Sequence, residues 1–150
     1  MKICLVCSHG GHLTQMLKLL DAVEKHKHFL VTFKSETTSD SKDTYFIKFE
    51  GWDIRGKILL LKTFLLAFKI LYKEKPDIII TTGAGEIAVP FCYIGKLLGI
   101  KIIFIESFSR INTPSAGGKI IYPIADLFLI QWKSLFSKYG KKAKYWGQII

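Results

Sequence analysis

The amino-acid sequence predicts an α/β protein built on a doubly wound, mostly parallel, Rossmann-like sheet. Short apolar runs alternate with longer segments of helical periodicity, and two of the runs end in glycine-rich turns. The chain of 150 residues is long enough for one domain with a hydrophobic core. Hydrophobic residues make up 49% of it, which argues against general disorder. We therefore expect a single domain over residues 1–150.

The first half of the chain is expected to supply three strands and two helices. Residues 2–7 form a short apolar run that ends at glycines, which predicts a buried strand, and residues 12–25 have apolar side chains at helical spacing. Residues 28–33 and 45–49 are predicted to be the second and third strands, on either side of a loop rich in Ser and Thr. The long helix 57–75 is expected to end before a proline.

The second half is expected to continue the alternation. Residues 77–82 and 101–106 are apolar runs that predict strands four and five, and helix 86–98 between them ends at Gly99 as a C-cap. Pro114 suits the first position of a further helix. The remaining predicted elements are strand 126–131, short helix 132–139 and a C-terminal tail 143–150. The six strands are expected in the order 3-2-1-4-5-6.

Two glycine-rich loops fall at the carboxyl ends of strands that are neighbours in this order. Gly10 and Gly11 follow the first strand, and Gly83 and Gly85 follow the fourth. Glycine lets backbone N–H groups approach a ligand, and the N-terminus of the following helix attracts negative charge. Either loop alone is equally explained by a tight strand-to-helix turn. Together they predict a site that binds a diphosphate.

Two polar residues beside these loops are candidates for chemistry. His12, in the first turn of the first helix, could donate to a phosphate, act as a general base, or simply pack. Glu106 ends the fifth strand at the same edge, where its carboxylate could bind sugar hydroxyls, accept a proton, or cap a loop through backbone N–H groups. We expect both to face the ligand, with a general-base role for one of them.

A dinucleotide cofactor is an alternative interpretation of the second loop. Residues 83–88 (GAGEIA) fit the G-x-G-x-x-A fingerprint, and Glu106 follows at roughly the spacing of a ribose-binding acid. The match falls at the fourth strand, after a complete glycine loop at the first, and Pro90 comes early in the helix. We therefore expect no nicotinamide or flavin.

The formal net charge of +10, nearly all of it lysine, favours an anionic partner. Arg55 and Arg110 are the only arginines and no nucleic-acid-binding fingerprint is present, so a membrane surface suits the charge better than nucleic acid. Cys4 and Cys7 resemble a CxxC motif, but residues three apart in a strand face opposite ways, so we expect no metal site.

The predicted helix 57–75 has more apolar surface than one face of a sheet can bury. Lys62 and Lys69 share a narrow stripe and interrupt the apolar run, so we expect no membrane-spanning segment. The apolar run at residues 3–7 is too short for a secretory signal. Most of the remaining circumference is apolar and includes Phe64, Leu65 and Phe68. Such a helix is typical of peripheral contact with an anionic membrane, with a second packed helix as the alternative.

An ordered set of motifs resembles one family. The set comprises Gly10-Gly11-His12, residues 75–83 (KPDIIITTG), Ile105-Glu106-Ser107 followed by Arg110, and the ending 145–150 (YWGQII). It resembles the PssD/CpsF-like proteins of polysaccharide biosynthesis. These are bacterial relatives of the membrane-anchoring subunit of the UDP-GlcNAc transferase that extends dolichol-linked oligosaccharide. The resemblance covers essentially the whole chain.

The resemblance implies the N-terminal half of a GT-B glycosyltransferase such as the peptidoglycan enzyme MurG, the half that binds the lipid acceptor. A separate catalytic glycosyltransferase subunit would carry the UDP-sugar site, which agrees with a chain too short to form a two-domain cleft. The acceptor would be a polyprenyl-diphosphate-linked sugar for capsule or exopolysaccharide. The tail would dock the partner through Tyr145, Trp146, Gly147, Ile149 and Ile150.

We therefore expect an accessory, acceptor-binding subunit that is active only with its partner and needs no cofactor of its own. It would lie peripherally at the cytoplasmic face of the plasma membrane. The alternatives are a nicotinamide- or flavin-binding domain, a complete small enzyme that uses His12, and a non-enzymatic module that binds a phosphorylated ligand.

Overall fold

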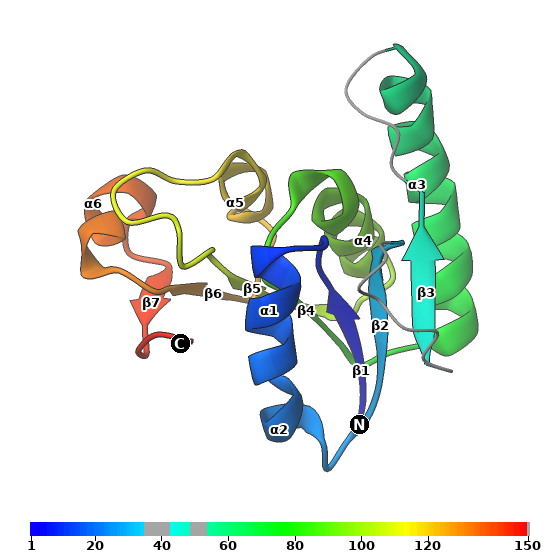
Figure 1. Cartoon of the computed structure of the whole chain (residues 1–150), viewed down its shortest axis with the longest axis horizontal. Coiled ribbons are helices and arrows are strands. Elements are labelled where there is room, and N and C mark those ends of the chain that lie inside the picture. Colours follow the sequence, from blue (N-terminus) through cyan, green and yellow to red (C-terminus); the bar gives the residue numbers. More distant parts are fainter. Residues whose placement is uncertain (35–42, 49–53, 150) are drawn as a thin grey trace.

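The computed structural model describes residues 1–34, 43–48 and 54–149, with the backbone alone for 54–59. Its described residues form one seven-stranded sheet in the order β3-β2-β1-β4-β5-β6-β7 (Figure 1). Every neighbouring pair of strands is parallel. The strands are β1 (Lys2–Val6), β2 (Lys27–Phe33), β3 (Thr44–Ile47), β4 (Ile78–Thr81), β5 (Lys101–Ile105), β6 (Leu127–Ile130) and β7 (Ala143–Tyr145).

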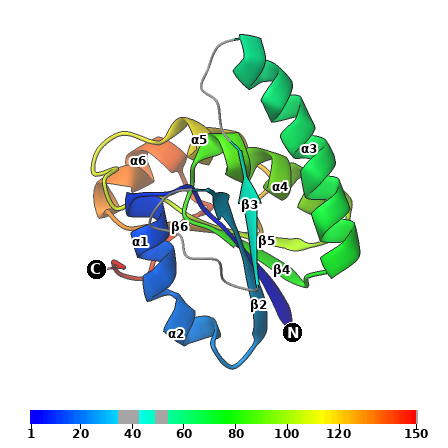
Figure 2. The same ribbon diagram turned by 45° about the vertical axis from the view of Figure 1, so that its right-hand side comes forward.

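Helices cover both faces of the sheet, which makes it doubly wound. The helices are α1 (Gly11–Lys18), α2 (Leu20–Val23), α3 (Ile54–Glu74), α4 (Gly85–Leu97), α5 (Ala116–Ile121), a 3₁₀ turn (Lys133–Leu135) and α6 (Phe136–Tyr139). Figure 2 shows α1 and α2 on one side of the sheet and α3 and α4 on the other. The buried residues accordingly form two clusters, a smaller one under α1 and α2 and a larger one under α3 to α6.

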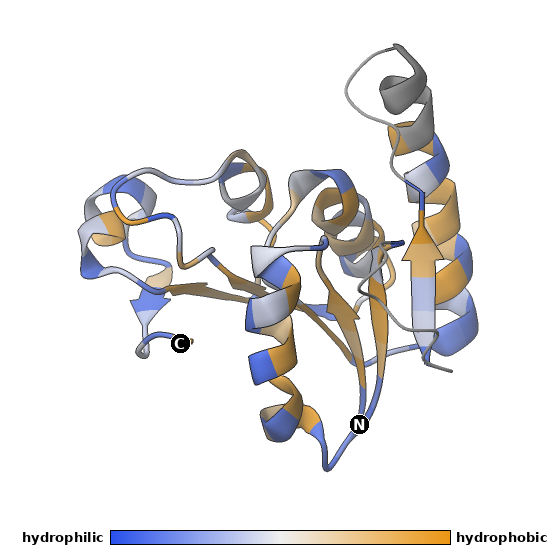
Figure 3. Ribbon diagram, viewed as in Figure 1, coloured by the Kyte–Doolittle hydropathy of each residue, from blue (hydrophilic) through white to orange (hydrophobic). Residues whose placement is uncertain are grey.

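The central strands are largely apolar because both of their faces are buried. Figure 3 draws most of β1, β2 and β4 in the orange of hydrophobic residues. Phe91, Phe104 and Phe128 are among the largest fully buried side chains. The rings of Phe104 and Phe128 stack with their centroids 4.8 Å apart. Each such ring stabilises the fold by about 1.5–3 kcal/mol relative to an exposed one.

The predicted fold class and strand order are confirmed, but the predicted tail is partly wrong. Residues 143–145 form β7, which pairs with β6 and extends the sheet by one strand. Ala143 is buried against the core and Lys144 is exposed. A strand of three residues is too short to show this alternation clearly, so the sequence predicted only an irregular end.

Several element boundaries also differ from the prediction. The helix predicted over 12–25 is interrupted at Leu19, which separates α1 from α2. α5 begins at Ala116 rather than at Pro114, because the Ser115 side chain accepts a hydrogen bond from the Gly118 N–H and caps the helix. Phe49, the last residue of the predicted third strand, lies outside the described residues.

The cysteines are placed as expected. Cys4 and Cys7 belong to the two different core clusters, on opposite faces of the sheet. Both are buried, as is Cys92. Burial raises the pKa of the Cys7 thiol to about 12. The Cys7 thiol is therefore protonated at neutral pH and a poor nucleophile.

Candidate functional site

A pocket of about 300 Å³ opens at the carboxyl edge of the sheet, beyond the ends of β1, β4 and β5. This is the edge at which doubly wound α/β proteins bind ligands. The start of α1, the starts of α4 and α5, and the loop after β5 surround it. Its lining residues are Ser8, His12, Ala84, Gly85, Glu86, Ser107, Ser109, Arg110, Ser115, Ala116 and Gly117.

The four glycines predicted to cradle a diphosphate occupy different environments. Gly85 lines the pocket at the first position of α4. Gly10 and Gly11 are exposed and Gly83 is buried, and none of these three lines the pocket. Of the two glycine loops, only the loop after β4 brings a glycine to this pocket, where Gly117 of α5 also lines the wall, and the diphosphate cradle stays a prediction.

Gly83 instead supports the histidine. His12 Nδ1 lies 2.7 Å from the Thr82 carbonyl oxygen, and the Thr82 hydroxyl donates to the His12 carbonyl at 3.0 Å. A Cβ atom on Gly83 would lie 3.1 Å from His12 Cε1, and the Gly83 φ of +105° also favours glycine. The two glycine loops thus meet through the imidazole ring.

This contact fixes the tautomer of His12. A carbonyl oxygen only accepts hydrogen bonds, so Nδ1 must carry the proton that it shares with Thr82. In the neutral ring the lone pair is then on Nε2. His12 lines the pocket and is half-buried. It is therefore able to accept a proton from a ligand in the pocket.

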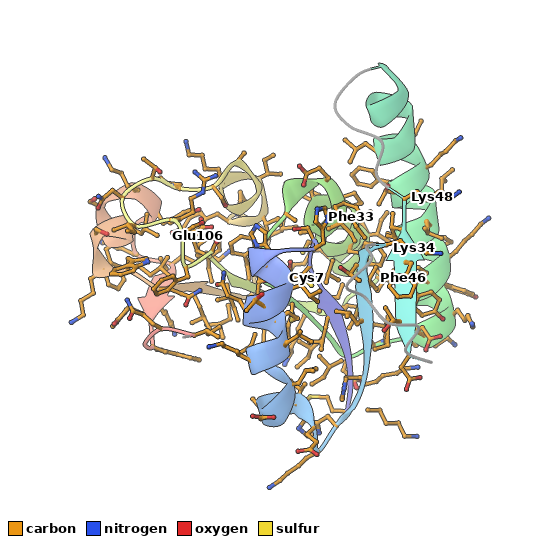
Figure 4. All side chains as sticks on the ribbon, in the orientation of Figure 1. Cys7, Phe33, Lys34, Phe46, Lys48 and Glu106 are labelled. Atoms are coloured by element: carbon orange, nitrogen blue, oxygen red, sulfur yellow. The ribbon has the colours of Figure 1, made fainter. Side chains whose placement is uncertain are left out.

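Glu106 does not line this pocket, although the sequence analysis expected its carboxylate to face the ligand. Its side chain is fully buried and is not part of the lining (Figure 4). Oε1 accepts from the Ser107 N–H at 2.9 Å, and Oε2 accepts from the Ser115 N–H at 3.1 Å and the Ser115 hydroxyl at 3.0 Å. The Tyr139 hydroxyl also donates to Oε2. The loop-capping role that the sequence left open is the one observed.

The hydrogen bonds of Glu106 join the start of α5 to α6, and they affect the pKa of Tyr139 and the space beside Gly118. Burial, followed by the hydrogen bond to Glu106, raises the pKa of Tyr139 well above its ordinary value, so this phenol stays protonated. A Cβ atom on Gly118 would overlap the Tyr139 hydroxyl and lie 2.7 Å from Glu106 Oε2. Because Glu106 is fully buried in these contacts, its carboxylate is not accessible as the ribose-binding acid of the alternative dinucleotide interpretation.

The starts of α4 and α5 lie unusually close together. A Cβ atom on Gly117 would lie 3.1 Å from the Gly85 Cα, so a larger residue at Gly117 requires a shift of the backbone, whereas a Cβ atom on Gly85 would lie 3.6 Å from the Gly117 Cα, an ordinary contact distance. The 13-residue helix α4 directs the N–H groups of its first turn towards the pocket, where its dipole favours an anion.

Two charged pocket residues were not predicted as site residues. Arg110 is exposed in the middle of loop 106–115, between β5 and α5. The sequence analysis named it only as one of two arginines and as part of a motif, although its position beyond a strand end was a usable signal. Glu86, at the start of α4, is the one carboxylate in the lining. Among the described residues, no hydrogen bond or ion pair involves its side chain.

The residues predicted for membrane contact are mostly exposed. Lys62, Leu65, Phe68 and Lys69 project from α3 into solvent, whereas Phe64 is half-buried. Four exposed apolar side chains continue one stripe along α3: Leu61 (67% exposed), Leu65 (63%), Phe68 (47%) and Tyr72 (63%). No helix among the described residues is long and apolar enough to cross a membrane.

The residues predicted for partner docking surround the end of β7. Tyr145 is half-buried at the end of the strand, and Trp146 and Gly147 are exposed, with 68% of the Trp146 side chain accessible. Ile149 is half-buried, and Ile150 lies outside the described residues. The segment after β7 therefore presents one large aromatic side chain to solvent.

Comparison with known proteins identifies the family. The family model "Oligosaccharide biosynthesis protein Alg14 like" matches residues 54–149. The human UDP-N-acetylglucosamine transferase subunit ALG14 is 26% identical, over 100% of this chain and 83% of its own length. The Schizosaccharomyces pombe subunit alg14 is 31% identical, over 92% of this chain and 78% of its own.

Solved structures agree on the fold. The chain superposes on Acinetobacter baumannii MurG with a TM-score of 0.75 at 15% identity, over 97% of this chain and 45% of MurG. It superposes on Rickettsia bellii UDP-N-acetylglucosamine 2-epimerase with a TM-score of 0.76 at 16% identity, over 99% of this chain and 45% of that enzyme. The chain thus spans just under half the length of these proteins, and has the fold of one GT-B-like half.

Proposed function

Because the chain belongs to the Alg14 family, we propose that it is the acceptor-binding subunit of a two-component UDP-sugar glycosyltransferase. The family match is the observation that carries the proposal. The curated relatives are named as subunits of a UDP-N-acetylglucosamine transferase, and the chain covers most of their length. The chain has the fold of half of MurG, and a GT-B active site needs both halves. A separate catalytic subunit would supply the UDP-sugar site.

The pocket at the carboxyl edge would bind the diphosphate and first sugar of a polyprenyl-diphosphate acceptor. Arg110 provides a guanidinium with the geometry that phosphate oxygens accept, and the N-terminus of α4 beginning at Gly85 adds backbone N–H groups. Serine hydroxyls supply further donors. The Glu86 carboxylate would repel phosphate, so it fits the sugar hydroxyls instead.

His12 would act as the general base. The acceptor hydroxyl would attack the anomeric carbon of the UDP-sugar, UDP would leave with the bonding electrons, and the hydroxyl proton would pass to His12 Nε2. The hydrogen bond from Nδ1 to Thr82 orients the ring for this step. Glu106 would act only through the walls that it holds in place.

The exposed stripe on α3 would seat the subunit on the membrane. Leu61, Leu65 and Phe68 would enter the headgroup boundary while Lys62 and Lys69 meet anionic lipid. The bacterial motifs would place this surface at the cytoplasmic face of the plasma membrane, in capsule or exopolysaccharide synthesis. The segment with Trp146 would dock the catalytic partner.

The decisive experiment is a transferase assay on membranes that carry lipid-linked acceptor, with radiolabelled UDP-sugars. This chain, the protein encoded beside it, and both together would be compared. We expect transfer only, or far faster, with both. Full activity from this chain alone would refute the split-enzyme proposal, as would inactivity of the pair with a working acceptor and donor.

Point variants refine this test. His12→Ala should lower kcat by about 100-fold or more, the usual contribution of a general base. Arg110→Ala should raise the acceptor KM, whereas Lys138→Ala, which removes an exposed cation outside the pocket, should change neither constant. An Arg110→Ala enzyme that matches Lys138→Ala would remove Arg110 from the diphosphate site.

Membrane seating is tested separately by sedimentation with anionic vesicles. The double variant Leu65→Ser, Phe68→Ser should bind more weakly than the unchanged protein. Leu17→Ser is the matched control, because Leu17 is 48% exposed on α1, across the sheet from α3. Equal vesicle binding by the double variant and the control would exclude the α3 stripe.

A further inference from the structure

A buried glutamine joins the C-terminal segment to the interior of the site. Gln131 follows β6 and is 2% exposed. Its Nε2 donates to Gln15 Oε1 at 2.7 Å and to the Glu106 carbonyl oxygen at 2.9 Å. Its Oε1 accepts from the Ile149 N–H at 2.7 Å. One side chain thus connects α1, the end of β5 and the segment that follows β7.

The second glutamine continues this connection to the pocket wall. Gln15 Oε1 also accepts from the Phe108 N–H at 3.1 Å, and the Trp132 indole N–H donates to the Phe108 carbonyl at 2.7 Å. The Phe108 and Trp132 rings pack with their centroids 5.1 Å apart. Phe108 lies between Ser107 and Ser109, which both line the pocket. The backbone of the wall is therefore held from both sides by side chains.

The Gln131 amide can hold this wall in only one orientation. Its oxygen faces an N–H donor at Ile149, and its nitrogen faces two oxygens, on Gln15 and Glu106. A flipped amide would place nitrogen against the Ile149 N–H and oxygen against both acceptors. The backbone N–H of Ile149 and the Glu106 carbonyl oxygen thus select the same amide orientation, which positions Gln15 and, through it, Phe108.

We propose that Gln131 is a positioning residue that couples the seating of residues 146–149 to the geometry of the pocket wall at Ser107–Arg110. The proposal rests on the proposed function, in which the pocket binds acceptor and the segment docks the catalytic partner. A partner that binds Trp146 would hold Ile149 in one position. Through the hydrogen bond between Ile149 and Gln131, it would also hold the wall that carries Arg110 in one position. By linkage, acceptor binding would strengthen partner binding to the same degree.

The coupling is tested first in the isolated chain, where no transferase activity is needed. Gln131→Leu removes the amide, and Ile149→Pro removes the N–H at the other end of the contact while it also fixes φ at residue 149. In ¹H–¹⁵N correlation spectra both should shift the backbone amide signals of Phe108 and Arg110. The control is Gln148→Leu, since Gln148 is exposed in the same segment. Shifts no larger than those of the control would overturn the proposal.

The kinetic arm uses the two-component enzyme. Gln131→Leu should raise the acceptor KM about tenfold while kcat and the UDP-sugar KM stay within about twofold, the pattern of a disturbed binding wall. Gln131→Glu restores one acceptor for Ile149 but not the two donors, so it should not rescue. An unchanged acceptor KM, or an equal loss with Gln148→Leu, would contradict the coupling.

The two arms separate this inference from the proposed function. If the unchanged two-component enzyme is inactive with every donor, the proposed function fails while the spectra still decide whether the segment and the wall are coupled. If Gln131→Leu does not fold, Gln15→Leu removes the next contact in the chain and is judged by the same amide signals.

Discussion

Replacing Glu106 with glutamine distinguishes a structural carboxylate from a catalytic one. The buried side chain accepts four hydrogen bonds, one from the Ser107 N–H and three from Ser115 and Tyr139. The two hydroxyls can rotate, but the two backbone N–H groups cannot. Whichever way the glutamine amide turns, its NH₂ faces the N–H of either Ser107 or Ser115, and that donor loses its acceptor.

The magnitude follows from these contacts. A buried donor without a partner costs about 1–3 kcal/mol, and bonds to charged groups are worth about 1.5–3 kcal/mol. We therefore expect Glu106→Gln to lower the free energy of unfolding by about 2–4 kcal/mol, since one donor is orphaned and the remaining bonds weaken. Tyr139→Phe removes only one of the four donors and should cost about 1 kcal/mol.

Urea unfolding followed by tryptophan fluorescence measures this cost. With an m-value of about 2 kcal/mol per molar, the midpoint for Glu106→Gln should fall by about 1–2 M. Glu86→Gln is the matched control, because it makes the same chemical change at a pocket carboxylate and should shift stability by less than about 0.5 kcal/mol. A Glu106→Gln protein as stable as this control, yet inactive with its partner, would refute the structural role and favour a catalytic one.

Two further predictions concern the contact of Gly83 with His12 and the hydrogen bonds of Glu74. Gly83→Ala places a Cβ atom 3.1 Å from His12 Cε1 at a φ of +105°. The variant should lose about 1–3 kcal/mol of stability, which lowers the melting temperature, and the His12 ring signals should shift in NMR spectra. Unchanged His12 ring signals would contradict the contact. Hydrogen bonds from Lys2 and then Tyr45 hold the pKa of Glu74 below its ordinary value of 4.5. The stability that the Glu74 carboxylate adds to the fold is therefore present above pH 4.5 and is lost as the pH falls through the folded-state pKa. Glu74→Gln should therefore lower the melting temperature at pH 7, and this loss should shrink as the pH is lowered below 4.5; a loss that does not change with pH would exclude the carboxylate as the cause.

Most of the fold was predictable because its signals are local. The apolar runs and the glycine turns after β1 and β4 are read within a few residues, and the observed strand order matches the expected one. The predictions that were wrong depend on distant contacts. β7 exists because Ala143 packs into a core built by earlier strands, and α5 starts where Ser115 can bond both Gly118 and Glu106.

The edge of the sheet at which His12 and Glu106 lie was predictable, but the direction of their side chains was not. Parallel strands bring their carboxyl ends to one edge, so residues that follow β1 and β5 lie near the same edge, while the functional roles of the two residues stay predictions. Which of them faces the ligand depends on partners far along the chain, because the Glu106 carboxylate bonds residues 9 and 33 positions away. For Arg110, which directly follows Ser109, the position beyond a strand end was the one local signal that separated it from a surface cation.

The polar residues at this edge divide according to the hydrogen-bonding capacity that the protein leaves unused. Glu106 and Gln131 are buried, and the protein's own donors and acceptors use both oxygens of the first and both polar atoms of the second. Such groups can hold a wall but have nothing left for a ligand. In the His12 ring only Nδ1 is hydrogen-bonded among the described residues, and the side chains of Glu86 and Arg110 line the pocket. A ligand in the pocket would therefore be recognised by this second set, together with the serine hydroxyls of the lining and the N–H groups at the start of α4, while mutations in the first set should act through geometry and stability.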